Sequence, residues 1–245
     1  MTYCVGLSLD AGLIFLADSR TNAGVDQIST FRKATVFENP GERVMVLMSA
    51  GNLALSQSLV SILDERNRAE DAVGIMQAPN MFEAAQLIGK GLRDLHARDA
   101  MALNDHSIEF NITMIFGGQI GREPPRLFYI YAAGNFIEAT ADTPYFQIGE
   151  SKYGKPILDR VVTRSTSLAQ GAKCALISMD STIRSNLSVG LPLDLISVPR
   201  DALRVGSHIN IDAEHAYFKM VRTRWSESLR HAFHELPDPD WLRRS

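Results

Sequence analysis

The order in which strand-like and helix-like patterns follow one another places the strongest constraint on the fold of this chain. Strand-like runs come first, then two helical segments, more strand-like runs, a second pair of helical segments, two further strands and a last helix. A doubly wound parallel sheet needs strands and helices in strict alternation, which this order does not provide. Helix pairs between antiparallel hairpins instead predict an α+β fold, in which two antiparallel sheets stack and helices cover their outer faces.

The strand-like runs share an apolar, β-prone composition and are bounded by turn residues. We expect strands at residues 3–9, 12–17, 28–37, 44–48, 110–116, 126–132, 136–140, 145–148, 193–198 and near Ile209. The first two runs are joined by Asp10-Ala11-Gly12, a composition typical of a tight hairpin turn. The run at 110–116 has a period-two pattern, and the three runs after it are expected to extend its sheet.

The helical segments show apolar residues at helical spacing and, in places, capping signals. We expect helices from Asn52 to about residue 63, from Asn80 to about residue 95, and at 152–162, 167–179 and 212–235. Asn80 is a favourable N-cap residue, and Glu83 stands three residues later, in the capping-box position. Two prolines near the start of residues 236–245 stop the last helix. No repeat or linker is found, so we expect a single domain over 1–245, with 236–245 as a short C-terminal tail.

Charge and cysteine content exclude several classes of protein. The 245 residues include 25 Lys and Arg against 28 Asp and Glu, a net charge of −3. Without a basic excess or a run of basic residues, no nucleic-acid partner is expected. The two cysteines, Cys4 and Cys174, are too few for a disulfide framework and fit a reducing compartment, so we expect a cytoplasmic protein.

One stretch is long enough to span a membrane and needs a separate argument. Residues 44–63 carry no charge, but the stretch contains several serines and the polar residues Asn52 and Gln57, which are costly in lipid. A buried strand running into an amphipathic helix explains the stretch better. The first residues lack the basic region of a signal peptide, so we expect no membrane partner.

Familiar catalytic and cofactor motifs are absent. The sequence has no GxxxxGK[ST], no GxGxxG after a strand, no HExxH, no pair of CxxC motifs and no GxSxG around Gly149-Glu150-Ser151. His231 and His234 lie three residues apart on the last predicted helix, but no cysteine or acidic cluster accompanies them. A solvated helix face explains this pair, and we expect neither a metal nor a cofactor.

The beginning of the sequence is its most informative part. Removal of Met1 exposes Thr2, which then carries a hydroxyl group and a free α-amine on one residue. A hydroxyl is a weak nucleophile unless a base lies beside it, and the amine, with a pKa of about 7.7, provides such a base. By itself Thr2 is also explained as the start of a strand. Cys4 is a second candidate nucleophile, but its release requires three residues to be trimmed, and its place in a strand favours burial.

Three further segments fit chemistry at Thr2. Asp18-Ser19-Arg20 directly follows the second predicted strand, Lys33 lies in the next strand-like run, and Ser49-Ala50-Gly51-Asn52 joins a strand to a helix. A charge-balanced lysine beside the hydroxyl and a backbone N–H for the oxyanion are what such a hydrolase requires. Each segment also has a simpler explanation, as a surface turn with a local ion pair or a solvated lysine.

These segments together resemble a known family. MTYCVGLSLDAGLIFLADSRTNAG, followed by Lys33 and Ser-Ala-Gly, is similar to the proteasome β-subunit and HslV-type N-terminal nucleophile peptidases, and most closely to their bacterial branch, Anbu. The resemblance covers nearly the whole chain. It implies a four-layer αββα sandwich, in agreement with the element order, and a threonine peptidase.

The resemblance also implies roles for individual residues. Thr2 matches the nucleophile, Lys33 the lysine that lowers the pKa of the nucleophile and its amine, and Asp18 the carboxylate paired with this lysine. Gly51 matches the glycine whose N–H lines the oxyanion hole. Residues expected to bind substrate are Ser19, Arg20 and Ser49, the last falling where the family shapes a substrate side-chain pocket.

The match is looser later in the chain. Gly149-Glu150-Ser151 stands where the family usually has Gly-Ser-Gly, so the serine near the terminal amine is Ser151 or is absent. Asp180 falls where many members carry the aspartate that orients this group.

The implied function is hydrolysis of peptide bonds in peptides or unfolded proteins, within a homo-oligomeric ring or ring-like helical assembly. The sequence does not indicate whether an ATPase takes part. Two alternatives stay open: an N-terminal nucleophile amidase acting on small amides, and a non-enzymatic assembly subunit in which Met1 is retained.

Overall fold

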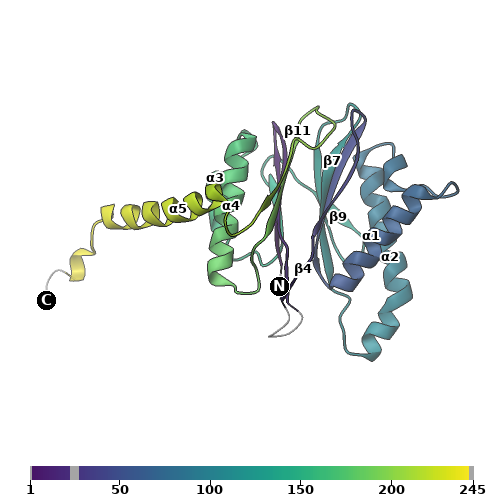
Figure 1. The fold of residues 1–245 in the computed structure, drawn as a ribbon, viewed down its shortest axis with the longest axis horizontal. Helices are drawn as coiled ribbons and strands as arrows, with labels where there is room; N and C mark the ends of the chain where they lie inside the picture. The colour runs from purple at the N-terminus through teal and green to yellow at the C-terminus, as the bar shows by residue number, and fades with distance from the viewer. Residues whose placement is uncertain (1, 23–27, 243–245) are drawn as a thin grey trace.

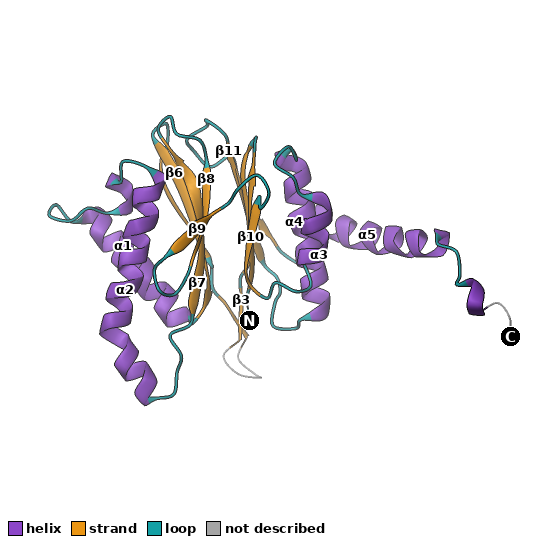
Figure 2. Cartoon of the chain, turned by 180° about the vertical axis from the view of Figure 1, so that it is seen from behind, coloured by secondary structure: helices purple, strands orange, loops and turns teal. Residues whose placement is uncertain are grey.

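Two five-stranded antiparallel sheets lie face to face at the centre of the structure, and helices cover both outer faces (Figures 1 and 2). This is a computed structural model, and it describes residues 2–22 and 28–242. The layers confirm the αββα sandwich that the element order predicts.

The first sheet has the strand order β10-β1-β2-β11-β12. Its strands are β1 (Tyr3–Leu9), β2 (Gly12–Asp18), β10 (Tyr145–Gly149), β11 (Leu193–Pro199) and β12 (Ser207–Ile211). The predicted hairpin is present, with Leu9 paired with Gly12 at its turn. Gly12 has φ of +134°, and a Cβ atom there would lie 2.2 Å from the carbonyl oxygen of Val198, so the turn requires glycine.

The second sheet has the strand order β5-β6-β7-β8-β9. Its strands are β5 (Ala34–Asn39), β6 (Arg43–Gly51), β7 (Ile112–Ile120), β8 (Arg126–Ile130) and β9 (Phe136–Glu138). A separate two-stranded ribbon is formed by β3 (Arg20–Asn22) and β4 (Ile28–Thr30).

Two strand predictions differ from the structure. The single strand expected over 28–37 is two strands, because the chain crosses between β4 and β5 from the ribbon to the second sheet. β10 does not extend the sheet of β7 but pairs with β1 in the first sheet, with Ile148 opposite Cys4. A period-two pattern shows which side chains share a face, but it does not identify the partner strand.

The helices cover the two outer faces in pairs. The second sheet is covered by α1 (Leu53–Arg68) and α2 (Met81–Asp105), and the first by α3 (Lys155–Val161) and α4 (Leu168–Ser185) (Figure 2). Short 3₁₀ turns lie at Ile75–Gln77 and Asp240–Leu242. The side chain of Asn80 accepts a hydrogen bond from the N–H of Glu83, as the predicted cap requires.

Three apolar layers hold the sandwich together. Buried side chains from both sheets fill the central layer, among them Phe15, Val46 and Ile115. The other two layers lie between each sheet and its helices. The uncharged stretch 44–63 is accordingly divided between buried strand β6 and amphipathic helix α1, and no helix in the described part of the chain meets the length and hydropathy needed to cross a bilayer.

The last helix, α5 (Ala216–Glu235), leaves the body of the structure and projects away from it (Figure 1). Only Phe218 and Val221 of this helix are buried. Phe233, near the end of this helix, is 72% exposed.

Candidate active site

Thr2 directly precedes β1, and its backbone is held from two directions. The N–H of Glu150 donates to the carbonyl oxygen of Thr2 at 2.7 Å. On the other side, the N–H of Tyr3 donates to Oδ1 of Asp18 at 2.9 Å. The residue after β10 and the carboxylate at the end of β2 therefore hold the backbone on the two sides of the predicted nucleophile.

Gly149 lies in close contact with Thr2. It has φ of +79°, and a Cβ atom at this position would lie 2.0 Å from the carbonyl oxygen of Thr2. Only glycine fits both the backbone conformation and the space available.

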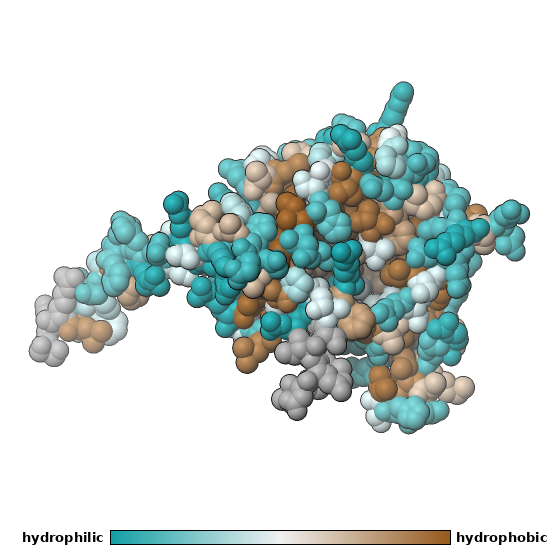
Figure 3. All heavy atoms as spheres, viewed as in Figure 1, coloured by the Kyte–Doolittle hydropathy of each residue, from teal (hydrophilic) through white to brown (hydrophobic). Residues whose placement is uncertain are grey.

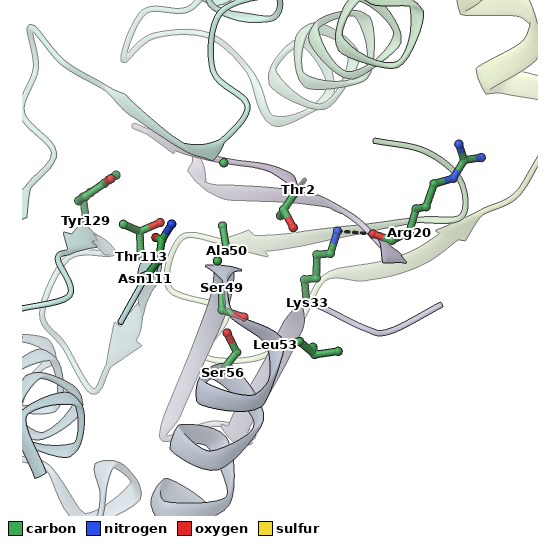
Figure 4. Close-up of a pocket in the computed structure, with 12 residues that line it drawn as sticks. Thr2, Arg20, Lys33, Ser49, Ala50, Leu53, Ser56, Asn111, Thr113 and Tyr129 are labelled. Carbon is green, nitrogen blue, oxygen red and sulfur yellow. Dashed lines mark hydrogen bonds between the residues drawn. The ribbon is translucent and has the colours of Figure 1, made fainter. Parts of the chain in front are cut away.

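Asp18 and Lys33 form a buried ion pair beside Thr2. The ammonium group of Lys33 lies 2.7 Å from Oδ1 of Asp18, and the two side chains are 6% and 0% exposed. It also donates to the carbonyl oxygen of Arg20 at 2.7 Å. In Figure 4 the amino end of Lys33 points toward the Thr2 side chain. The end of β2 and the segment between β4 and β5 thus bring a cation to the hydroxyl group.

The surroundings of Asp18 act on its ionisation in opposite directions. Burial raises the pKa of the Asp18 carboxyl, while the Lys33 ammonium and the N–H groups of Tyr3 and Gly190 lower it, and burial has the larger effect. The N–H of Gly190 donates to Oδ2 at 3.4 Å. Both carboxylate oxygens are therefore occupied, which fixes the side chain that positions Lys33.

The opposite wall of the site is the turn from β6 into α1. Gly51 has φ of +112°, and a Cβ atom there would lie 2.3 Å from the carbonyl oxygen of Asn111. The side chain of Asn52 caps α1 by accepting from the N–H groups of Ala54 and Leu55. This turn places a strand end and a helix N-terminus against the same hollow.

A cavity of about 570 Å³ opens between these walls. The predicted residues that line it are Thr2, Arg20, Lys33, Ser49 and Gly51. Asn111, Thr113 and Tyr129, from the region of β7 and β8, complete the lining together with Ala50, Leu53, Ser56 and Gly149 (Figure 4). Sequence reasoning assigned no role to Asn111, Thr113 or Tyr129, because no local motif marks them.

Ser19 and Arg20 occupy different environments. The hydroxyl group of Ser19 donates to the carbonyl oxygen of Pro192 at 2.6 Å, and Ser19 is not among the residues that line the cavity. The guanidinium of Arg20 donates to the carbonyl oxygen of Leu187 at 3.1 Å and packs against Gly190. In Figure 4 this side chain extends away from Thr2, and the backbone carbonyl of Arg20 is the group that contacts Lys33.

Ser151 and Asp180 do not line the cavity either. Ser151 lines a separate pocket near Tyr145 and Lys155. Asp180 lies on α4, where it pairs with Arg222 of α5 at 2.7 Å and with Arg184 at 3.0 Å. The structure thus brings Thr2, Asp18, Lys33, Ser49 and Gly51 together and places these two residues outside the group.

The histidine pair and the cysteines lie away from this cavity. His231 and His234 are exposed on α5, and no group of three or more potential ligands in the described ranges could hold a metal ion. Cys4 and Cys174 are buried free thiols. Burial raises the pKa of both thiols, that of Cys174 to about 11.

Comparisons with known proteins identify relatives among solved structures. No family model matches the chain, and no curated protein matches it significantly. Anbu (ancestral β-subunit) from Yersinia bercovieri is 52% identical with a TM-score of 0.92, over 97% of this chain and 99% of that chain. A Gly-1 mutant of Anbu from Hyphomicrobium sp. strain MC1 is 48% identical with a TM-score of 0.91, over 98% and 100% of the two chains. A helical assembly of the Anbu complex from Pseudomonas aeruginosa gives 48% identity and a TM-score of 0.91, over 97% and 98%.

Proposed function

The chain belongs to the Anbu family of proteasome-related proteins, and from this premise we propose that it is a threonine peptidase whose nucleophile is Thr2. The observation that carries the proposal is the buried ion pair of Lys33 with Asp18, formed beside Thr2 and not at the surface. A lysine ammonium held there by a carboxylate can stabilise negative charge on the neighbouring hydroxyl oxygen when that oxygen reacts as a nucleophile.

Activation begins when Met1 is removed and the α-amine of Thr2 is released. At neutral pH a substantial fraction of such an amine is neutral, because its ordinary pKa is about 7.7. The cation of Lys33 disfavours a second positive charge nearby and stabilises the negative charge that develops on Oγ1 of Thr2. The amine can therefore accept the hydroxyl proton, directly or through one water molecule.

The reaction then proceeds through an ester. Oγ1 of Thr2 bonds to the carbonyl carbon of the substrate, and the N–H of Gly51 stabilises the resulting oxyanion. The C–N bond breaks, the leaving amine takes the proton held by the α-amine, and an acyl-enzyme remains. Water attacks the ester with the same amine as base, which releases the acid and restores the hydroxyl group of Thr2.

Ser151 and Asp180 have a supporting place in this proposal. Asp180 joins α4 to α5 through Arg222, and Ser151 lies in the segment that follows Gly149, the neighbour of Thr2. We assign them to positioning of these segments. Ser19 acts likewise, through its bond to the carbonyl oxygen of Pro192, whereas Ser49 faces the substrate.

Exposed apolar side chains on one face of α5 support a homo-oligomer. Trp225, Leu229, Phe233 and Leu236 follow one another at spacings of four, four and three residues, which places them on one face of α5 and its end. An apolar face on a projecting helix is stable in water when another surface covers it. A relative is described as a helical assembly. We therefore propose that copies of this chain assemble in the cytoplasm through α5.

Intact mass spectrometry and covalent labelling test the proposal. The mature protein should lack Met1, and a peptidyl epoxyketone should add once, at Thr2. The Thr2→Ala variant should keep its far-ultraviolet circular dichroism spectrum and lose both labelling and peptide hydrolysis. Full activity of this variant, or retention of Met1 in cells, would end the proposal and favour a non-enzymatic assembly subunit. Hydrolysis of small acyl-amino-acid amides but not of peptides would favour the amidase alternative.

A further inference from the structure

A second cavity, of about 380 Å³, continues from the one at Thr2. Lys33, Ser49, Leu53 and Ser56 line both cavities, so the two are connected at the turn into α1. Its volume falls in the usual range for ligand pockets, about 300–1,000 Å³. A peptide substrate whose carbonyl group is bound at Thr2 has this space, beyond Ser49, available for one of its side chains.

The lining of the second cavity mixes polar side chains with apolar ones, among them Leu47 and Val60, and carries positive charge. Arg32 lies in the segment between β4 and β5, and Gln57 and Ser61 lie on α1. Lys33 is already balanced by Asp18, which leaves the charge of Arg32 to act on a ligand. No carboxylate is among the described residues that line either cavity.

The N-terminus of α1 adds to this charge. Leu53 and Ser56 belong to its first turn, which contains no acidic residue. Helix N-termini carry a partial positive charge that favours anions. Arg32 on one side of the second cavity and the N-terminus of α1 on the other thus both contribute positive electrostatic potential to it.

From this lining we infer that the second cavity selects an acidic side chain, aspartate or glutamate, at the substrate residue whose carbonyl Thr2 attacks. This inference rests on the proposed function. Arg32 is the residue that determines specificity, through a charge-assisted hydrogen bond to the carboxylate. Gln57 and Ser61 provide further donors for its second oxygen.

Matched electrophiles test the inference. Two peptidyl epoxyketones that differ only in Glu or Gln beside the electrophile have nearly the same shape. The Glu probe should label Thr2 roughly five- to tenfold faster than the Gln probe, a range limited by the solvent exposure of Arg32. Raising the salt concentration from about 0.05 M to about 0.5 M should reduce this ratio.

Two substitutions distinguish the effect of the charge of Arg32 in the cavity from the effect of the overall charge of the protein. In Arg32→Gln the Glu/Gln ratio should fall to about one, while Arg68→Gln, an exposed change at the far end of α1, should keep the wild-type ratio. Equal labelling by both probes in the wild type, or an unchanged ratio in Arg32→Gln, would overturn the inference and leave the proposal for Thr2 standing. If neither probe labels Thr2, the proposed function fails, and this inference fails with it.

Discussion

Lys33 and Asp18 meet through a single carboxylate oxygen, 2.7 Å from the ammonium group, and that oxygen also accepts the N–H of the residue after Thr2. The ion pair is therefore joined through the backbone to the proposed nucleophile. A change in the pair acts on both the charge beside Thr2 and the position of β1.

Replacing Lys33 by methionine is expected to destabilise the protein and abolish labelling. Both partners are almost completely buried, so the change leaves an uncompensated carboxylate and costs about 3–5 kcal/mol of unfolding free energy. The double variant Lys33→Met/Asp18→Asn should recover much of that stability without recovering labelling. Urea unfolding followed by fluorescence measures the free energy of unfolding, and mass spectrometry measures the labelling of Thr2. Labelling at the wild-type rate in the double variant would show that the pair is structural only.

Replacing Gly149 by alanine should slow labelling of Thr2 at least about tenfold. The new methyl group would lie 2.0 Å from the carbonyl oxygen of Thr2, so the nucleophile must shift. Gly41→Ala is the control, because Gly41 also has positive φ but no atom within 4 Å of an added Cβ. Both variants carry a backbone strain of about 1–2 kcal/mol. If the two variants are labelled at the same rate, close contact at Gly149 does not position Thr2.

Neither cysteine is expected to react in the folded protein. With its pKa raised to about 11, Cys174 is ionised to only about one part in a thousand at pH 8. Cys4 is fully buried, and its pKa is also raised. Iodoacetamide at pH 8 should therefore modify both thiols only after denaturation, as peptide mapping would show. Rapid alkylation of Cys4 in the native protein, with loss of activity, would return it to consideration as the nucleophile.

A charge on the apolar face of α5 should disrupt assembly. Phe233→Asp places a carboxylate where we propose that another copy packs, and Thr223→Asp adds the same charge at an exposed position in the first half of the helix, away from that face. Light scattering and sedimentation velocity should show smaller particles for Phe233→Asp and wild-type particles for Thr223→Asp. In Figure 3 the visible surface of the projecting arm is mostly hydrophilic, with a few apolar atoms near its end. A wild-type protein that sediments as a monomer would contradict the proposed assembly.

Sequence patterns predict most elements of this fold because the signals are local. The β1–β2 hairpin and the N-cap of α2 each depend on residues a few positions apart. The position of β10 could not be predicted in this way, since its partner β1 lies more than a hundred residues away in the sequence. The same limit applies to Asn111 and Tyr129, which reach the cavity only because the second sheet brings β7 and β8 beside Thr2.

The sequence by itself determined most of the segments that form strands and helices, which polar residues are candidates for chemistry, and the Anbu-like character of the chain. The tertiary structure decided which of those residues meet. It joins Lys33 to Asp18, brings Gly149 against Thr2, and directs Asp180 to Arg222 instead of the cavity. The physical reason is that periodicity and capping depend on neighbours in the chain, whereas a site forms from contacts between distant segments, and these are fixed only when the two sheets pack.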